Sequence, residues 1–477
     1  MATDYRFYLA GQWEQSAQKL VVTNPYDDSV VAATWLASEA DVERATQGAV
    51  SAAPVIGALA AFERAAILAQ ASVILTRRRD EVGRMLSAEA GKPIRDALTE
   101  VDRAAMTFHV ASEEARRLGG EVIPLDLAAH GKGRIGIVRR FPIGPVAAIS
   151  PFNFPLNLSA HKIAPAIAAG NPIVLKPATK TPLSALFLAS ALDEAGLPAG
   201  GLSVLPMSRE LGDRLVTDER FKLLTFTGSS SVGWDMKARA GKKKVILELG
   251  GNAGVIIDET ADVAYAVKRV VTGGFAYAGQ SCISVQRVFV HDRLYDEFAR
   301  LLAAKVQSLV VGHPLDSTTD VGPMIDAGEV DRIEAWVKEA VGAGARVLAG
   351  GTRVSRSVYA PTVLDGVPEV AKVCAQEVFA PLVGLYRFTD FSQAIAAVNR
   401  SRYGLQAGVF TNDLTHMLAA YDAIEAGGVI INDVPSWRID HMPYGGVKDS
   451  GIGREGPRYT IEEMTEPKLL VINRDTF

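Results

Sequence analysis

The sequence predicts an α/β protein built from buried parallel strands and the helices that connect them. Short apolar runs alternate with helix-like segments from position 146 onward, and a second series of the same kind continues to position 432. Alternation of this kind is typical of parallel sheets covered by helices on both faces. With 477 residues, 48% of them hydrophobic, the chain is long enough for two such domains.

The part of the chain before these series, residues 38–118, is predicted to be helical. Ser38 can cap a first helix, an amphipathic run ends near Gly91, and a third run starts at Pro93 and stops at a pair of glycines. The segment 121–142 then changes character, because polar and apolar residues alternate in it as in an exposed strand or hairpin.

The two series of strands follow in order along the chain. Each predicted strand is a short apolar run, and segments with helical spacing of their apolar residues connect most of them. In the first series the strands are 146–149, 173–175, 202–205, 223–226 and 245–249. In the second they are 255–257, 287–290, 346–349, 383–388 and 429–432, with helices at 262–278, 292–311 and 327–343.

The C-terminal tail ends in an apolar run that belongs to neither series. A detached strand there would have unpaired edges unless it joined another subunit. We therefore expect one domain from 1–120 and 143–250, a second from 251–450, and a small β segment from 121–142 and 458–477. This small segment would bridge the subunits of a homodimer or homotetramer.

Charge and cysteine content exclude several kinds of partner. A net charge of -4 and a pI of about 6.1 provide no basic surface for nucleic acid or for an anionic membrane. The longest uncharged stretch, 141–161, is too rich in proline to be a membrane helix. Two cysteines cannot form a disulfide scaffold and the N-terminus does not resemble a signal peptide, so we expect a cytoplasmic protein. The histidines show no metal-ligand spacing, and no metal is predicted.

Cys282 is the first candidate for chemistry. It lies in the segment 275–283 (FAYAGQSCI), where small residues let a ligand come close to the sulfur. A thiolate attacks a carbonyl carbon well when a neighbour lowers its pKa or takes its proton. The alternative is a buried cysteine that acts as a small apolar side chain, which is the role we assign to Cys374.

Two motifs at predicted strand ends could serve this thiol, since ligands bind at the carboxyl ends of strands in open α/β sheets. In 150–155 (SPFNFP), Asn153 can donate a hydrogen bond to an oxyanion, or it can stabilise a turn. In 248–252 (ELGGN), Glu248 is suitably placed for a general base, with an ordinary surface glutamate as the alternative.

Two further motifs could hold a nucleotide. In 174–179 (VLKPAT), Lys176 can meet a nucleotide hydroxyl or phosphate, although a solvated lysine is the commoner situation. In 224–230 (LTFTGSS), a strand turns into a helix at Gly228, and the N–H groups of a helix N-terminus can bind phosphate. A plain capped turn is the alternative there.

These motifs, in this order along the chain, resemble those of the aldehyde dehydrogenase superfamily. Further similarities are 377–381 (EVFAP), Asn432 and 443–451 (PYGGVKDSG), so the resemblance covers nearly the whole chain. It implies an aldehyde dehydrogenase-like fold, with an NAD(P)-binding domain in 1–120 and 143–250 and a catalytic domain in 251–450, and a homodimer or homotetramer.

The resemblance also implies a chemical role for each central residue. The Cys282 thiolate would attack the aldehyde, and Asn153 with the backbone N–H of Cys282 would stabilise the resulting oxyanion. Loss of a hydride would leave a thioester, and Glu248 would activate the water that hydrolyses it. Lys162 and Glu455 stand at the positions that resemble the proton-relay pair of the family.

The cofactor implied by the resemblance is NADP or NAD. Many family members that prefer NAD have a glutamate at the position of Thr179, and its charge repels the 2′-phosphate of NADP. Thr179 is neutral and is followed by Lys180, so we expect NADP to be accepted without exclusion of NAD. The implied cofactor contacts are Ile149, Ser150, Pro151, Phe152, Lys176, Ala178, Thr179, Gly228, Ser229, Glu377 and Phe379.

The substrate side of the site is predicted to favour an aldehyde with an anionic tail. Arg103, His161 and Arg438 stand at positions that face the substrate tunnel in similar proteins, and together they would attract a carboxylate, sulfonate or phosphate. Relatives that bind glyceraldehyde 3-phosphate often have an arginine where this chain has Ser281, which argues against that substrate. A salt bridge from Arg438 to Asp440, or a subunit contact, is the alternative role for this arginine.

Other functions remain open on the sequence alone. A neutral, lactaldehyde-like substrate or a broad range of aldehydes would suit the same catalytic residues. A CoA-acylating dehydrogenase is disfavoured by Glu248, because only hydrolysis needs that base. An inactive structural protein is disfavoured because it would have no need of Cys282, Asn153 and Glu248 together.

Overall fold

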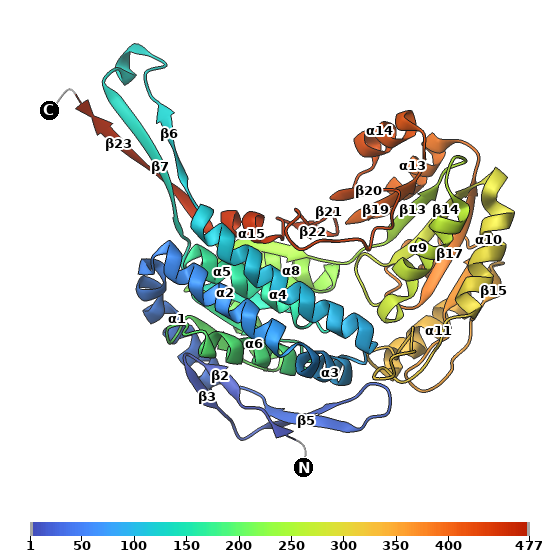
Figure 1. Ribbon diagram of the computed structural model, residues 1–477, viewed down its shortest axis with the longest axis horizontal. Helices are drawn as coiled ribbons and strands as arrows, with labels where there is room; N and C mark the ends of the chain where they lie inside the picture. Colours follow the sequence, from blue (N-terminus) through green and yellow to red (C-terminus); the bar gives the residue numbers. More distant parts are fainter. Residues whose placement is uncertain (1–2, 475–477) are drawn as a thin grey trace.

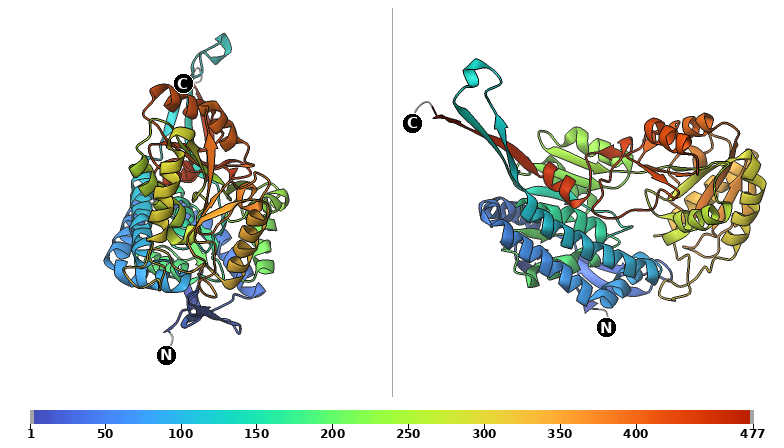
Figure 2. Two further views of the ribbon diagram at one scale, coloured as in Figure 1. Left: turned by 90° about the vertical axis from the view of Figure 1, so that its right-hand side faces the viewer. Right: turned by 45° about the horizontal axis from the view of Figure 1, so that its top comes forward.

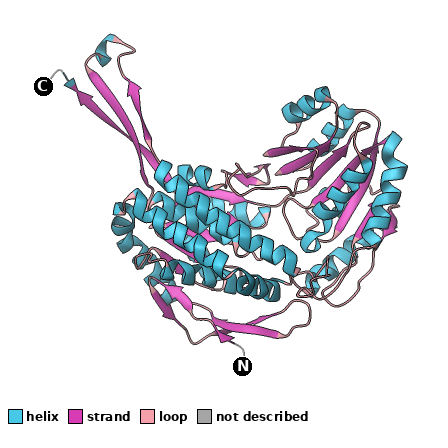
Figure 3. Cartoon of the chain, viewed as in Figure 1, coloured by secondary structure: helices cyan, strands magenta, loops and turns pink. Residues whose placement is uncertain are grey.

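The computed structural model describes residues 3–474 and confirms the α/β class. Two α/β halves lie side by side, and a narrow arm of strands projects from the first half, near the C-terminus (Figure 1). Coloured by secondary structure, each half shows strands packed against helices, whereas the arm consists almost entirely of strands (Figure 3). The two halves have separate hydrophobic cores.

An eight-stranded sheet forms the centre of the first half, in the order β22-β12-β11-β8-β9-β10-β2-β3. Its middle strands are parallel, and antiparallel strands pair at both edges. All five strands predicted for the first series are present, each within one residue of its expected ends. The bounds are β2 (Phe7–Leu9), β3 (Gln12–Glu14), β8 (Val146–Ile149), β9 (Ile173–Lys176), β10 (Leu202–Val204), β11 (Leu223–Thr227), β12 (Lys244–Glu248) and β22 (Gly451–Ile452).

Helices surround this sheet, and the predicted helical region is confirmed with one change. The run that ends near Gly91 is divided at Arg78, where the backbone leaves the helical conformation (φ -101°, ψ 20°). Four helices therefore replace the expected three. The helices of this half are α1 (Glu39–Ala58), α2 (Ala61–Arg77), α3 (Arg79–Ala90), α4 (Ile94–Arg117), α5 (Asn157–Ala169), α6 (Leu183–Glu194), α7 (Arg209–Thr217), α8 (Ser230–Arg239) and α15 (Pro457–Glu463).

A seven-stranded sheet forms the centre of the second half, in the order β15-β16-β17-β14-β13-β19-β20. All its neighbours are parallel except β15 and β16. Its strands are β13 (Ala253–Ile257), β14 (Val285–His291), β15 (Arg346–Ala349), β16 (Thr362–Asp365), β17 (Leu382–Phe388), β19 (Gln406–Phe410) and β20 (Gly428–Ile431). Its helices are α9 (Val263–Phe275), α10 (Asp292–Gln307), α11 (Ala327–Gly342), α12 (Lys372–Ala375), α13 (Phe391–Asn399) and α14 (Leu414–Ala423).

The arm is a three-stranded antiparallel sheet of β6 (Gly120–Pro124), β7 (Arg134–Pro142) and β23 (Thr465–Asn473), with β7 in the middle. It projects away from both halves in Figure 1 and in the right-hand view of Figure 2. Leu469 and Leu470 on β23 are 50% and 56% exposed. The expectation for the tail needs one correction, because α15 occupies its first residues and packs against α4 and α5. The polar sequence of α15 concealed this helix.

Short elements near the N-terminus are missing from the sequence prediction. β1 (Thr3–Asp4), β4 (Lys19–Thr23) and β5 (Val30–Trp35) form a small sheet of their own. Within residues 3–474, no single helix is long and apolar enough to cross a membrane; α1 and α2 meet that test only together, and they are bent by 112° at their junction.

The chain crosses between the halves at two places that lie next to each other. It leaves the first sheet after β12 and returns to pair β22 with β12. Ser450 joins the two crossings, since its carbonyl accepts from the N–H of Leu249 (3.0 Å) and its hydroxyl donates to the carbonyl of Gly250 (2.7 Å). Glu248 ends β12 at this junction. The loop that carries Cys282 packs against it, since an added Cβ at Gly251 would lie 2.0 Å from the carbonyl oxygen of Cys282.

Candidate active site

Cys282 lies on the loop after α9, beside a tyrosine. The loop includes Tyr277 and Ala278, whose φ values of 47° and 52° are unusual for residues with a side chain and are typical of strained functional loops. The Cys282 Sγ atom lies 3.0 Å from the hydroxyl oxygen of Tyr444. Burial raises the pKa of Cys282 to about 12, and the hydrogen bond with Tyr444 acts in the opposite direction.

Asn153 lies on the loop after β8, and its amide nitrogen donates to the carbonyl of Gln280 at 3.0 Å. This contact joins the loop of Asn153 to the loop of Cys282, two residues before the sulfur. The Asn153 side chain is buried, so its remaining amide hydrogen is held in a site from which water is largely excluded. Such a donor can stabilise a negative oxygen formed next to Cys282.

A buried ion pair that the sequence analysis missed supports both loops. Glu100 accepts hydrogen bonds from the backbone N–H groups of residues 156–157, at 3.0 and 3.1 Å, and pairs with Lys92. The Lys92 ammonium lies 3.7 Å from the ring centre of Phe154 and 4.4 Å from that of Tyr277. Both charges are fully buried. A lysine and a glutamate eight residues apart form no recognisable sequence motif, so this pair could not be predicted.

Glu248 is the last residue of β12 and is 3% exposed. Neither of its carboxyl oxygens has a hydrogen-bond partner among the described residues. Burial raises its pKa well above the usual range, and the negative charge of Glu455 adds to the rise. Burial and the neighbouring charge therefore favour the protonated form, and the side chain acts as a base only after it loses that proton.

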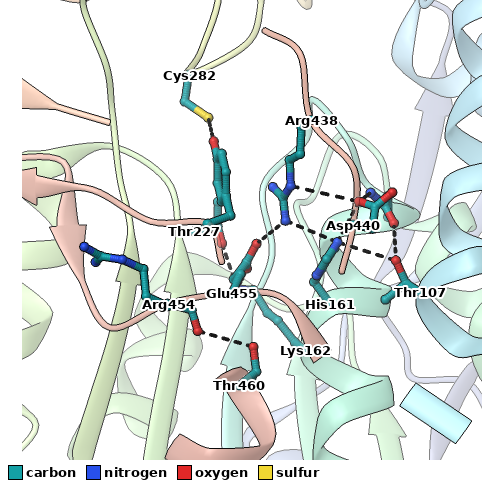
Figure 4. A network of polar contacts seen from close by, with 12 residues as sticks. Thr107, His161, Lys162, Thr227, Cys282, Arg438, Asp440, Arg454, Glu455 and Thr460 are labelled. Atoms are coloured by element: carbon teal, nitrogen blue, oxygen red, sulfur yellow. Dashed lines mark hydrogen bonds and ion pairs between the residues drawn. The ribbon is translucent and has the colours of Figure 1, made fainter. Parts of the chain in front are cut away.

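Lys162 and Glu455 lie together, as the resemblance implied. The Lys162 ammonium is 3.4 Å from Glu455 and donates to the hydroxyl groups of Thr225 (3.1 Å) and Thr227 (2.7 Å). Burial lowers the pKa of Lys162, whereas the charge of Glu455 raises it. Figure 4 shows this pair below Cys282, within one network of polar contacts.

Arg438 enters the same network from above Glu455 (Figure 4). Its guanidinium group lies 3.3 Å from Glu455 and 3.6 Å from the ring centre of Tyr444. The distance to Asp440 is 4.0 Å, so Glu455 is the closer carboxylate. Only 5% of the Arg438 side chain is exposed. This arginine therefore lies in the interior of the site, with a carboxylate and an aromatic ring as neighbours.

Asp440 holds the other two side chains predicted to face the substrate. It accepts two hydrogen bonds from Arg103 (3.0 and 2.8 Å), one from Asn157 (3.0 Å) and one from His161 (2.9 Å). These contacts lower the pKa of Asp440, and burial lowers that of His161. A proton on Nε2 of His161 makes the contact with Asp440 a hydrogen bond, because a carboxylate only accepts; a guanidinium nitrogen of Arg438 lies 3.2 Å from the same ring nitrogen.

Arg103, His161 and Arg438 thus converge, but carboxylates balance both arginines. Asp440 is 337 positions from Arg103 in the chain, and Glu455 is 17 positions from Arg438. From the sequence, Asp440 was expected only as a possible partner of Arg438, whereas its guanidinium partner in the structure is Arg103. Ser281 precedes Cys282 and is partly buried, with its hydroxyl 3.4 Å from the N–H of Ile283.

The residues expected to bind the adenosine half of a cofactor lie at adjacent strand ends. Ile149 and Lys176 end the neighbouring strands β8 and β9, and α8 begins two residues after Gly228. The Lys176 side chain lies over Gly212, where an added Cβ would come within 2.6 Å of its Cδ atom. Thr179 is exposed. These groups form a cradle that suits a ribose and a pyrophosphate.

Lys180, expected to contribute positive charge next to Thr179, forms an ion pair with Asp326. The carboxylate of Asp326 therefore offsets the attraction of Lys180 for a 2′-phosphate.

The residues expected at the nicotinamide end lie on the other side of the junction. Glu377 accepts a hydrogen bond from the N–H of Gly251 at 3.0 Å, and burial raises its pKa to about 7. An added Cβ at Gly250 would lie 2.4 Å from the Glu377 carboxylate, so any side chain there would displace this carboxylate. The rings of Phe152 and Phe379 meet edge to face, with their centres 5.9 Å apart. This arrangement fits a dinucleotide, with Glu377 as an acceptor for ribose hydroxyls.

In the part of the chain that the structure describes, no group of three or more His, Cys, Asp or Glu side chains could hold a metal ion.

Known proteins resemble this chain over nearly its whole length. Residues 13–470 match the aldehyde dehydrogenase family. A 3-sulfolactaldehyde dehydrogenase of Priestia megaterium is 45% identical over 470 residues, which make up 98% of each chain. The crystal structure of aldehyde dehydrogenase 21 from Physcomitrella patens, in complex with the reaction product succinate, is 49% identical, with a TM-score of 0.98 and 99% of each chain covered.

A third relative was solved with a cofactor. Glyceraldehyde-3-phosphate dehydrogenase GapN from Methanocaldococcus jannaschii, complexed with NADP, is 39% identical over 95% of this chain and 99% of its own, with a TM-score of 0.92. The resemblance drawn from the motifs is therefore confirmed: the chain belongs to the aldehyde dehydrogenase family and is an NAD(P)-dependent enzyme.

Proposed function

We propose that this enzyme oxidises a short aldehyde with an anionic tail to the corresponding carboxylic acid. The observation that carries the proposal is the position of Arg438, a buried cation next to the ring of Tyr444 and therefore close to Cys282. Arg103 supplies a second, partly exposed guanidinium nearby. The relatives support the same class, since one is named for sulfolactaldehyde and another was solved with succinate.

In the proposed reaction the Cys282 thiolate attacks the aldehyde carbon and forms a C–S bond. The negative oxygen that results accepts hydrogen bonds from the Asn153 amide and from the backbone N–H of Cys282. Loss of one such donor typically costs about 2.7–4 kcal/mol of barrier. The Glu100–Lys92 pair would keep the Asn153 donor in place, because Glu100 holds residues 156–157, three and four positions after Asn153.

A nicotinamide cofactor, held with Glu377 at its ribose, would supply the hydride acceptor, and loss of the hydride from the tetrahedral carbon would leave a thioester on Cys282. Glu248 in its ionised form would take a proton from water, and the hydroxide would then release the acid and regenerate the thiol. Glu455 and Lys162, 3.4 Å apart, would take this proton onward; Glu455 is close enough to raise the pKa of Glu248, and a water between the two carboxyl groups would complete the route, since Glu248 has no hydrogen-bond partner among the described residues. We also assign the first half of the chain to cofactor binding and the second to catalysis.

A second candidate is the oxidation of neutral, lactaldehyde-like substrates. It is favoured by the pairing of Arg103 with Asp440 and of Arg438 with Glu455, because these carboxylates offset the positive charge. An anionic substrate would then be attracted only if it displaced one of these carboxylates from its arginine or shared the arginine with it.

The test is the initial rate of reduced-nicotinamide formation across paired aldehydes, each with NAD and with NADP. Each pair should contain a neutral aldehyde and a carboxylated or sulfonated one of similar length. We expect Arg438→Ala to lower kcat/KM for the anionic member about ten- to a hundredfold relative to the neutral one, as for loss of a hydrogen bond to a charged group. Arg269→Ala is the matched control, because Arg269 forms an ion pair with Asp433 in the same half. Equal losses for both aldehydes would favour the second candidate.

A further inference from the structure

We propose that Tyr444 is a catalytic residue whose hydroxyl group donates a hydrogen bond to the Cys282 thiolate, and that Arg438, stacked on its ring, strengthens this donor. The inference rests on the proposed function only in that Cys282 is taken as the nucleophile. In the reaction steps above, no residue stabilises the thiolate before the aldehyde binds. The inference gives this role to Tyr444.

The geometry restricts what the tyrosine can do. Its hydroxyl oxygen lies 3.0 Å from Cys282 Sγ, within the range of a hydrogen bond to sulfur. In the neutral thiol either group can donate, but a thiolate has no hydrogen, so the bond then depends on the proton of Tyr444. A hydrogen bond to an ionised acceptor is stronger than a neutral one. The contact therefore favours the thiolate over the thiol.

Tyr444 also retains its proton at the pH where the enzyme works. Burial raises the pKa of Tyr444 well above its usual range, and neighbouring Cys282 adds to the rise. The phenol therefore remains a donor throughout the neutral and mildly alkaline range. During attack on the aldehyde, the hydrogen stays on the tyrosine oxygen and no proton transfer is required of it.

Arg438 makes this phenol a better donor. Its guanidinium lies 3.6 Å from the ring centre of Tyr444, and a cation over an aromatic face draws electron density from the ring. Glu455 fixes the guanidinium from one side, and a backbone bridge fixes Tyr444 to the same residue, with N–H to carbonyl distances of 3.1 and 2.6 Å. The three groups form one rigid unit beside the sulfur.

The other charged groups that influence the sulfur do not replace this donor. Glu377 and Glu248 raise the pKa of Cys282 when they are ionised, and Arg438 lowers it without a hydrogen bond to the sulfur. Among the described residues, Tyr444 is the side chain that makes a hydrogen bond to Cys282 Sγ. Without it, the thiolate would lie in a buried site beside two carboxyl groups.

The experiment measures the rate of Cys282 alkylation by iodoacetamide at a fixed, mildly alkaline pH in the full-length protein, with the modified peptide quantified by mass spectrometry. Below the pKa of Cys282 this rate follows the thiolate population, so for Tyr444→Phe we expect it to fall about ten- to a hundredfold, which corresponds to loss of a hydrogen bond to a charged group. Tyr359→Phe is the matched control, since Tyr359 is equally buried in the same half and its hydroxyl has no hydrogen-bond partner among the described residues. An unchanged alkylation rate in Tyr444→Phe would overturn the proposal.

A second measurement covers the case in which Tyr444→Phe does not fold. Replacement of Tyr444 by 3-fluorotyrosine, whose phenol is more acidic, should raise the alkylation rate at the same pH, whereas a merely packing role predicts no change. Alkylation needs neither aldehyde nor cofactor. A failed aldehyde panel would therefore leave this result intact, and a failed alkylation test would leave the substrate assignment intact.

Discussion

Replacing Asp440 with asparagine tests how far one carboxylate organises the substrate side of the site. Asp440 is 2% exposed, and its two oxygens accept four hydrogen bonds, from Arg103, Asn157 and His161. One oxygen takes three of these bonds, and the other takes only the Nε–H of Arg103. An asparagine that keeps its oxygen toward the three donors must direct its NH₂ group at the guanidinium, so two donors face each other.

The cost follows from burial. Removing one partner of a buried ion pair costs about 3–5 kcal/mol. The Arg103 side chain is 27% exposed, so water offsets part of that cost; we expect about 2–4 kcal/mol in the free energy of unfolding. One kcal/mol corresponds to about 2–4 °C in the midpoint of thermal unfolding for a domain of this size. The midpoint of Asp440→Asn should therefore fall by at least about 4 °C.

Thermal unfolding followed by circular dichroism is the assay, with Asp433→Asn as the control. Asp433 also holds an arginine through two hydrogen bonds, but its side chain is 19% exposed and that of Arg269 is 24% exposed. We expect this control to lose about 1 kcal/mol or less. Equal midpoints for the two variants would refute the reasoning, because the burial of Asp440 would then make no difference.

Three further predictions concern turnover, cofactor choice and assembly. Glu248→Gln should keep the first burst of reduced nicotinamide and slow later turnovers by about 10²–10⁴-fold, as for loss of a general base; release of free acid at the normal rate, without CoA, would contradict this. Because burial raises the pKa of Glu248, hydrolysis of the thioester in the unmodified enzyme should accelerate as the pH rises through that raised pKa, which single-turnover rates can check. Thr179→Glu should weaken NADP binding much more than NAD binding in fluorescence titrations, and an unchanged NADP affinity would count against the assignment. Leu470→Glu on the exposed face of β23 should reduce the mass measured by light scattering from that of a dimer or tetramer, and a monomeric unmodified protein would rule out the bridging role of the arm.

Most of the parallel strands were predictable because buried parallel strands are largely apolar. β16 and β19 were missed, since β16 begins and ends with a polar residue and β19 begins with Gln406 and contains a glycine. The small N-terminal strands were missed too: β1 has two residues, and β4 exposes alternate residues although three of its five are apolar. Cys282, Asn153 and Glu248 could be located because each lies in a motif next to a strand end or a glycine-rich loop.

Their ionic environment could not be predicted. Arg103 meets Asp440 across 337 positions of sequence, and Glu455 meets Lys162 across 293. Nothing local in the chain encodes such pairs. The sequence therefore identified the cations, and only the three-dimensional structure identified the carboxylates that balance them.

The two neighbouring crossings bring residues that are distant in sequence onto adjacent pieces of backbone. Glu248 is the last residue before the first crossing, Tyr444 lies on the segment that leads to the second, and Ser450 ties the two together. Side chains brace the same region from both halves, since Asn153 binds the carbonyl of Gln280 and Arg103 binds Asp440. The separation of the base from the nucleophile is therefore a property of the joint between the halves, and a substitution that loosens this joint would disturb the chemistry without touching a catalytic side chain.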